Sequence, residues 1–390
     1  MKNLLVLFAF ILSLTGFSQK PEKIYGNARQ HKSYSYYKEQ DIAWKKMVND
    51  HPKDPNAWYN YYYVNRNLMF NDTLRVRTPK EWNASINKIV EDMGKQIPES
   101  YEYNLCKWQT SGYDEKALPY LKKAAALGEG RTEHLDFMIN QGELGRDIQE
   151  RELYSIKKFD AGQFSSGIIY YNYNVLMGLE KNAILITSGD NDTYPIWLLQ
   201  AQGIRKDVTV INMYLIQLDD YRDKLFNELN AEKWQKTTGT TEEITEADHE
   251  RFRNTIVKHI AANKKGYPVY VALTTACSDK FTKSISENLY LTGLAYVYNT
   301  RPIDNIAVLK NNVEHAYAFD YLDKSFYHEI SPDMVKLING NYIVPLLTLY
   351  DHYKLSGDSY KSEWVKSKLM LISKETENEQ KVLKHIAQAR

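Results

Sequence analysis

The most chemically loaded stretch of the sequence is a run of four polar residues, Asp190, Asn191, Asp192 and Thr193. Gly189 precedes them and permits a turn that a side chain would obstruct. We consider three uses for their oxygens. Asp192 caps a helix, or Asp190 and Asp192 hold a divalent cation, or the group accepts hydrogen bonds from sugar hydroxyls. An anion is disfavoured because two carboxylates would repel it.

Two aromatic residues follow this run, and a second polar loop lies further along the chain. Tyr194 and Trp197 are three residues apart, so they share one helix face, either as a platform for a sugar ring or buried against a sheet. Thr274, Thr275 and Asp279 follow another apolar run. Because ligands bind beyond the carboxyl ends of parallel strands, the two loops are expected to face one crevice.

The enzyme signatures that we searched for do not identify a reaction. The sequence has no Gly-x-Ser-x-Gly, P-loop, His-Glu-x-x-His or Gly-x-Gly-x-x-Gly motif. Asp190 and Asp192 match the Asp-x-Asp of nucleotide-sugar glycosyltransferases, but so short a match arises by chance. The haloacid-dehalogenase pattern Asp-x-Asp-x-Thr fails because Thr193 follows Asp192 directly. The sequence therefore leaves open whether the chain is an enzyme.

Short apolar runs alternate with helical patterns in the middle of the chain. The runs have strand length and no polar face, which is typical of strands covered on both sides. They comprise residues 183–187, 208–213, 268–273 and 294–298. A helix is expected to begin at Asp192 or Thr193, with Pro195 in its first turn, and to end at Gly203. This alternation predicts an α/β fold with a mainly parallel sheet and flanking helices.

The sequence before this region predicts helical hairpins. Tyr101, Leu105 and Trp108 recur at spacings of four and three, which puts them on one helix face. After Gly112, a second face is formed by Ala117, Leu121 and Ala124. The pattern resembles a tetratricopeptide repeat, a helix-turn-helix unit of ~34 residues. Helical patterns return from about Met334 onward. We therefore divide the chain into a signal peptide (1–18), a helical tetratricopeptide-like domain (19–160), an α/β domain (161–325) and a C-terminal helical segment (326–390).

The first residues predict export. Lys2 precedes the apolar run Leu4–Leu14, and Gly16 and Ser18 supply the small residues of a cleavage site before Gln19. The run is about half of the ~20 residues that a spanning helix needs. We expect a periplasmic or extracellular protein with no membrane span after cleavage. Its two cysteines, Cys106 and Cys277, form no disulfide framework and are expected to be buried thiols.

The composition narrows the class of partner. The formal charge is +1, from 50 Lys and Arg against 49 Asp and Glu. This balance argues against nucleic acid, because phosphate contacts need a basic face. Tyrosine is abundant, at 31 residues, and suits helical repeats, partner grooves or sugar contacts alike.

Five ordered segments resemble the soluble C-terminal region of bacterial, protein O-mannosyltransferase-like membrane proteins with several spans. The segments are residues 182–197, 203–208, Asp219 with Tyr221, residues 268–272 and residues 289–296. Together they extend over about Ser165 to Tyr321. Asp220 stands where that family has Trp, and its membrane-embedded part has no counterpart in these 390 residues. The resemblance implies a relative of an extracytoplasmic domain and adds Asp219 to the candidate site; it does not imply a mannosyltransferase.

These observations favour a non-catalytic periplasmic adaptor. Helical repeats would bind a protein or peptide, and the α/β domain would bind a glycan-like ligand or a membrane partner. One alternative is a metal-dependent enzyme that acts on envelope glycans, with Asp190 and Asp192 as ligands or acid-base groups. Another is a structural subunit of an envelope assembly. No cofactor is implied beyond the divalent cation considered for Asp190 and Asp192.

Overall fold

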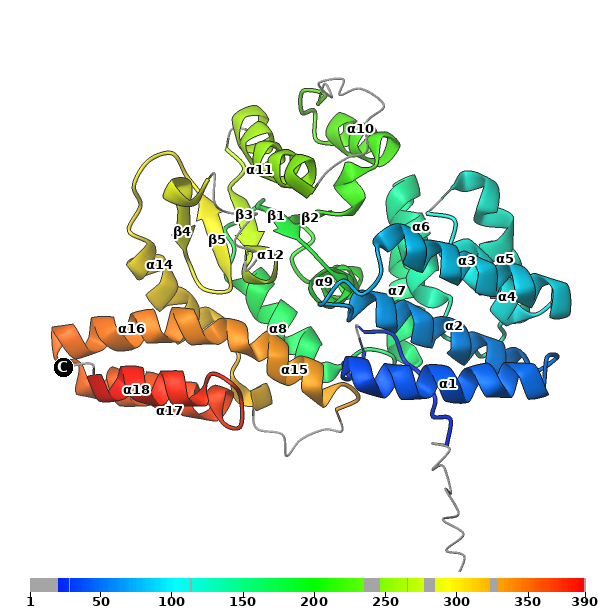
Figure 1. Cartoon of the computed structure of the whole chain (residues 1–390). Coiled ribbons are helices and arrows are strands. Elements are labelled where there is room, and N and C mark those ends of the chain that lie inside the picture. Colours follow the sequence, from blue (N-terminus) through cyan, green and yellow to red (C-terminus); the bar gives the residue numbers. More distant parts are fainter. Residues whose placement is uncertain are drawn as a thin grey trace, which may run out of the picture. The chain divides into compact units, whose positions relative to one another are not determined.

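The structure of the chain is a computed structural model (Figure 1), which describes residues 20–388 except 28, 113, 235–245, 265, 277–284 and 323–328. The signal peptide predicted for residues 1–18 lies outside the described residues. The chain forms two compact units. The first, here the helical unit, contains the described residues up to Asn27 and Lys32–Leu127; the second, here the mixed unit, contains the described residues of Ala28–His31 and from Gly128 onward.

The helical unit consists of α-helices that pack as neighbours along the chain. They are α1 (Tyr34–Asp50), α2 (Pro55–Phe70), α3 (Pro79–Gln96), α4 (Tyr101–Gln109) and α5 (Leu118–Leu127), with the 3-10 turn η1 (Glu115–Ala117) before α5. Side chains satisfy the first backbone N–H groups, as when Thr78 and Glu81 form a capping box at α3. Helix α1 packs on α2 and α4 on α5, so the predicted helical hairpins are present.

The hairpin of α4 and α5 is built from the residues that the spacing indicated. Tyr101, Leu105 and Trp108 of α4 are buried, as are Leu121 and Ala124 of α5. Between the helices, Gly112 has a φ of +65°, a conformation that glycine adopts without strain. Cys106 is buried in α4, as expected; Cys277 lies outside the described residues. Small residues on the inner face therefore set how closely the two helices approach.

Overpacking this contact should destabilise the helical unit. Ala124 is fully buried, so the extra methyl groups of Ala124→Leu have no space to enter. We expect a loss of about 1–3 kcal/mol in the free energy of unfolding, measured by urea denaturation. Ala126→Leu on the exposed side of α5 is the matched control and should stay within about 0.5 kcal/mol of wild type. Equal stability of the two variants would contradict this packing.

The mixed unit contains twelve numbered α-helices and five strands within its described residues. The helices before the sheet are α6 (Leu135–Gly145), α7 (Ile148–Asp160) and α8 (Ser166–Met177). Between and after the strands lie α9 (Asp190–Ala201), α10 (Asp219–Glu228), α11 (Glu246–Asn263), α12 (Leu273–Ala276) and α14 (Asn305–Asn311). The last helices are α15 (Pro332–Asn339), α16 (Ile343–Ser356), α17 (Ser359–Ser373) and α18 (Glu379–Gln388). The described part of the predicted C-terminal helical segment therefore contains these four α-helices.

The sheet has the strand order β2-β1-β3-β5-β4. Its strands are β1 (Ile184–Thr187), β2 (Thr209–Asn212), β3 (Val269–Ala272), β4 (Leu289–Leu291) and β5 (Ala295–Tyr298). Strand β1 is an interior strand and pairs in parallel with β2 and with β3, with Ile186 opposite Ile211 and Val271. All four residues of β1 and of β3 are buried, which explains their continuous apolar sequence.

The sheet is mixed, so the prediction of a mainly parallel sheet is wrong. Strands β3 and β5 pair antiparallel, as do β4 and β5. The connection from Leu291 to Ala295 is too short for a parallel crossover, which needs a dozen residues or more. Gly293 lies in this turn at a φ of +138°, where a side chain would collide with the Tyr317 hydroxyl. That hydroxyl accepts a hydrogen bond from the Leu294 N–H at 2.9 Å.

The boundary between the units lies at residues 127 and 128 and differs from the predicted boundary at 160 and 161. Helices α6 and α7 belong to the mixed unit because α7 packs on α9. The C-terminal helices also belong to it, through contacts such as that of α15 with α8. Among the residues that the structure describes, no helix is both long and apolar enough to cross a membrane.

Candidate functional site

The carboxyl ends of β1, β2 and β3 carry a connected set of polar side chains. The hydroxyl of Thr187, at the end of β1, lies 2.8 Å from that of Thr193 in α9. The amide of Asn212, at the end of β2, donates to the Thr193 hydroxyl and to the Ser188 carbonyl, both at 3.0 Å. Its amide oxygen accepts the backbone N–H groups that follow β2. The network fixes the loop between β1 and α9 to the neighbouring strand.

Asp192 lies at the centre of this loop and is nearly fully buried. It is the third residue of α9, whose N-cap is Gly189. The carboxylate accepts the backbone N–H of Gly189 at 2.6 Å and that of Ser188 at 2.9 Å. The Thr274 hydroxyl, from the first turn after β3, donates a third hydrogen bond. Asp192 therefore links the end of β1 to the end of β3.

Burial raises the pKa of the Asp192 carboxyl above its ordinary value, because a buried site disfavours the charged form. Its hydrogen bonds from Thr274, Ser188 and Gly189 lower the pKa, but they offset the effect of burial only in part. Asp192 is thus a buried acid whose two oxygens accept hydrogen bonds from other groups of the protein.

Asp190 and Asn191 lie on the first turn of α9, in a different environment. Helix α9 begins at Asp190, two residues before the predicted start, so Asp192 stabilises the helix from its third position and is not the N-cap. Asp190 is exposed and Asn191 is half-buried. Since the positive end of the helix dipole lies here, the exposed Asp190 carboxylate is electrostatically favoured. Asp190 therefore presents its carboxylate at the surface of this edge of the sheet.

Pro195 lies in the interior of α9, because the helix begins earlier than predicted. A proline has no N–H, so the carbonyl four residues before it, that of Asn191, loses its helical partner. The side-chain amide of Asn172 in α8 donates to this carbonyl at 2.7 Å. Asn172 is fully buried and also bonds the Ile168 carbonyl of its own helix. The contact between α8 and α9 thus holds the first turn of α9 in place.

Tyr194 and Trp197 are buried, so neither ring has the exposed face that a sugar platform needs. The two rings contact each other with centroids 5.7 Å apart. The Arg151 guanidinium of α7 lies 5.2 Å from the Trp197 ring, and Lys158 of α7 lies 5.1 Å from Tyr194. Both aromatics therefore pack α9 against α7, as in the burial alternative considered for the sequence.

The other candidate residues are divided between this network and the surface. Thr275 is buried, and its hydroxyl lies 3.4 Å from the Ile186 carbonyl of β1. Asp219 begins α10 and is largely exposed, where its carboxylate pairs with Arg222 at 2.5 Å. Asp279 lies outside the described residues. The structure thus brings together Asp192, Thr193, Thr274 and Thr275, whereas Asp219 bonds within its own helix.

Sequence reasoning missed Thr187, Ser188 and Asn212 as members of this network. Each follows or ends an apolar strand, and a polar residue at the carboxyl end of a buried strand is the signal that would have found them. The side chain of Asn212 bonds the backbone of the loop between β1 and α9, at Ser188, and that of the segment after β2, at Tyr214.

The arrangement offers little to a metal ion. No group of three or more His, Cys, Asp or Glu side chains lies close enough to hold a metal among the described residues. Both oxygens of Asp192 already accept hydrogen bonds. A cation bound by Asp190 would therefore lack Asp192 as a second ligand.

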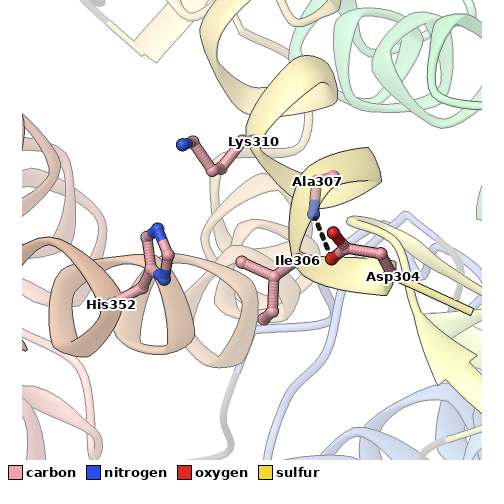
Figure 2. A pocket seen from close by; sticks show the side chains of 5 residues that line it. All are labelled: Asp304, Ile306, Ala307, Lys310 and His352. Carbon is pink, nitrogen blue, oxygen red and sulfur yellow. Dashed lines mark hydrogen bonds between the residues drawn. The ribbon is translucent and has the colours of Figure 1, made fainter. Parts of the chain in front are cut away.

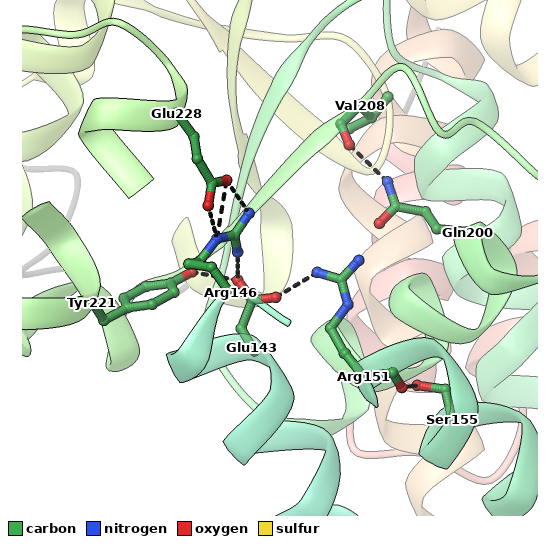
Figure 3. Close-up of polar contacts among 8 residues, drawn as sticks. All are labelled: Glu143, Arg146, Arg151, Ser155, Gln200, Val208, Tyr221 and Glu228. Atoms are coloured by element: carbon green, nitrogen blue, oxygen red, sulfur yellow. Dashed lines mark hydrogen bonds and ion pairs between the residues drawn. The ribbon is translucent and has the colours of Figure 1, made fainter. Parts of the chain in front are cut away.

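A second polar cluster surrounds Glu143 of α6 (Figure 3). Glu143 is fully buried and pairs with Arg146 and Arg151. The Tyr221 hydroxyl of α10 donates to the same carboxylate at 2.6 Å. Arg146 also pairs with the half-exposed Glu228 at 2.8 Å. The cluster joins α6, α7 and α10, which explains why the α6–α7 hairpin belongs to the mixed unit.

A shallow pocket of about 420 Å³ lies between α14 and α16 (Figure 2). Its lining residues are Asp304, Ile306, Ala307, Lys310 and His352. The Asp304 carboxylate accepts the Ala307 N–H at 3.0 Å and so caps α14. The pocket is open to solvent and is lined in part by polar side chains. It contains none of the residues singled out in the sequence.

Residues 169–345 match the family model described as TMEM260-associated domain 2. The TMEM260-associated segment covers less than half of the chain, begins in α8 and ends in α16. It contains all five strands and the whole network around Asp192. Searches of curated proteins and of solved structures found no match.

Proposed function

We propose that this chain is an exported, non-catalytic binding protein of the cell envelope, in which the mixed unit binds a glycan and the helical unit binds a protein partner. The observation that carries this proposal is the difference in burial between the two acids on the first turn of α9. Asp192 is buried and uses its oxygens within the protein, while Asp190 is exposed at the edge where ligands of parallel strands bind. Such a rim can accept hydrogen bonds from hydroxyl groups, and its negative charge disfavours phosphate.

The family match agrees with the resemblance on which this proposal draws. The TMEM260-associated segment, residues 169–345, overlaps most of the stretch that resembles O-mannosyltransferase-like membrane proteins. That resemblance motivates a mannose-containing glycan as the first ligand to test. Export and a periplasmic or extracellular location remain part of the proposal, supported by Lys2, the apolar run Leu4–Leu14 and Ser18.

The enzyme and assembly-subunit alternatives have less support. A metal-dependent enzyme would need ligands beside Asp190, and the described residues group none there with it. An acid-base reaction at Asp192 would need an accessible carboxyl with unused hydrogen-bonding capacity, whereas this carboxyl is buried and bonded. A purely structural subunit would not need an exposed acid at the ligand-binding edge of the sheet.

Replacing Asp190 by Asn tests the glycan site. Binding of methyl α-D-mannoside would be measured by isothermal titration calorimetry on the purified protein. We expect Asp190→Asn to weaken binding about tenfold, because a charged acceptor bonds a hydroxyl more strongly than an amide does. The free energy of unfolding should change by less than about 0.5 kcal/mol, as for other surface substitutions.

Asp220→Asn is the matched control, since Asp220 is an exposed acid on the first turn of α10. It should leave mannoside binding unchanged. Absence of binding to the wild-type protein, or equal binding by Asp190→Asn, would contradict the proposed glycan site. Unfolding of the mixed unit by Asp190→Asn would instead favour a structural role for this residue.

A further inference from the structure

A segment without helix or strand, residues 20–27, lies against α1 and α2 of the helical unit (Figure 1). Buried amide side chains of the two helices hold its backbone. The Glu22 N–H donates to Gln40 Oε1 at 2.8 Å, and the Ile24 N–H donates to Asn60 Oδ1 at 2.8 Å. Asn67 Nδ2 donates to the Tyr25 carbonyl, again at 2.8 Å. Side chains of the two helices therefore bond two N–H groups and a carbonyl of the segment.

The residues that hold the segment form stripes along the helices. Gln40 and Trp44 are four residues apart in α1, and the Trp44 indole N–H donates to the Glu22 carbonyl at 2.9 Å. Asn60 and Asn67 of α2 and Asn71, which follows the last residue of α2, are spaced by seven and four residues, so they lie along one side of the helix. Asn71 donates to the Asn27 side chain at 3.3 Å. The two stripes make a continuous polar track for a peptide backbone.

The contacts made by this track depend little on the amino-acid sequence of the segment. Ile24 is buried, but Glu22 and Lys23 are exposed. The hydrogen bonds of Gln40, Asn60, Asn67 and Trp44 go to backbone atoms, which every peptide offers. A non-helical peptide with an aliphatic residue in the place of Ile24 would meet the same contacts.

We infer that this face of α1 and α2 is a docking site for a non-helical peptide of another chain, and that the chain's own residues 20–27 occupy it in this structure. The inference rests on the proposed role of the helical unit in binding a protein partner, and it names the surface and the peptide chemistry. Because the resident segment is tethered, it competes at a high effective concentration. A partner peptide binds when residues 20–27 are released from the track, or when the aliphatic residue of the partner packs better than Ile24 does.

Exchange with a synthetic peptide tests this site. The probe is a fluorescein-labelled peptide of residues 20–27, and binding is followed by fluorescence anisotropy. In full-length Ile24→Asp protein the resident segment loses its buried contact, so the probe should bind at least tenfold more tightly than it binds wild type. A probe that carries the same Ile24→Asp change should bind neither protein.

Two further variants separate docking from nonspecific adhesion. Adding Asn67→Ala to the Ile24→Asp protein should weaken probe binding about tenfold, because it removes the donor to the Tyr25 carbonyl. Adding Asn83→Ala, an exposed asparagine of α3, should leave binding unchanged. Equal binding by the Asn67 and Asn83 variants, or no binding by the folded Ile24→Asp protein, would overturn the inference.

Hydrogen exchange on the wild-type protein gives a readout that does not depend on a variant folding. If the segment leaves its track, the Ile24 amide exchanges through local opening and at least tenfold faster than buried amides within α2. Exchange of the Ile24 amide only together with global unfolding would overturn the inference. Neither peptide readout depends on mannoside binding at Asp190, so failure of the glycan site is a distinct outcome.

Discussion

Replacing Glu143 by Gln is expected to lower the free energy of unfolding of the mixed unit by about 3–5 kcal/mol. Glu143 is fully buried and balances the charges of Arg146 and Arg151. Arg151 is itself buried, so its guanidinium cannot turn to water when the carboxylate is removed. A buried charge that loses its partner pays the desolvation cost without the compensating attraction. The Tyr221 hydroxyl loses a charged acceptor as well.

Urea denaturation followed by circular dichroism measures this effect. Glu228→Gln is the matched control, because Glu228 pairs with the same Arg146 but is half-exposed. An exposed pair contributes little, so this variant should lose less than about 1 kcal/mol. A Glu143→Gln protein within 1 kcal/mol of wild type would show that the cluster does not hold the α6–α7 hairpin on the mixed unit.

Asp192→Ala should have the second largest effect, with a loss of about 3 kcal/mol in the free energy of unfolding. The change removes the acceptor for the Ser188 and Gly189 N–H groups and for the Thr274 hydroxyl. Partly buried donors left without partners carry a desolvation cost, and the loss exceeds that of an ordinary helix cap. The loop between β1 and α9 would also lose its connection to the end of β3.

The contribution of the Asp192 carboxyl to the free energy of unfolding should fall as the pH rises. Its pKa is raised by burial in the folded protein, so the folded state binds more protons than the unfolded state between the unfolded and folded pKa values. Protonation therefore favours folding in that window, and stability from this group is lost as the pH increases through the folded pKa. The difference in stability between wild type and Asp192→Asn should be larger at the acidic end of the window than above it.

Denaturation titrations from pH 4 to pH 7 on both proteins measure this difference, because other groups titrate alike in each. Asp220→Asn, which removes an exposed and ion-paired carboxylate of α10, serves as the control for the loss of one acidic side chain. A difference that grows with increasing pH would mean that the hydrogen bonds of Asp192 outweigh its burial.

Local sequence patterns predicted many of the helices and four of the strands of this protein. The spacing of Tyr101, Leu105 and Trp108 predicted a buried helix face, because the helical period places such residues together wherever the helix packs. The apolar runs now seen as β1, β2, β3 and β5 predicted strands for a similar reason. These patterns are local, since they depend on which face of an element is covered and not on what covers it.

The tertiary structure decided how those elements and their polar residues are used. Nothing near Asp192 in the sequence indicates that Thr274 donates to it, and Asp190 and Asp192 look equivalent until the fold buries one and exposes the other. The contact between Glu143 and Tyr221, 78 residues apart, likewise places the α6–α7 hairpin in the mixed unit. The role of a carboxylate depends on its solvation and its donors, and both come from residues that only folding brings together.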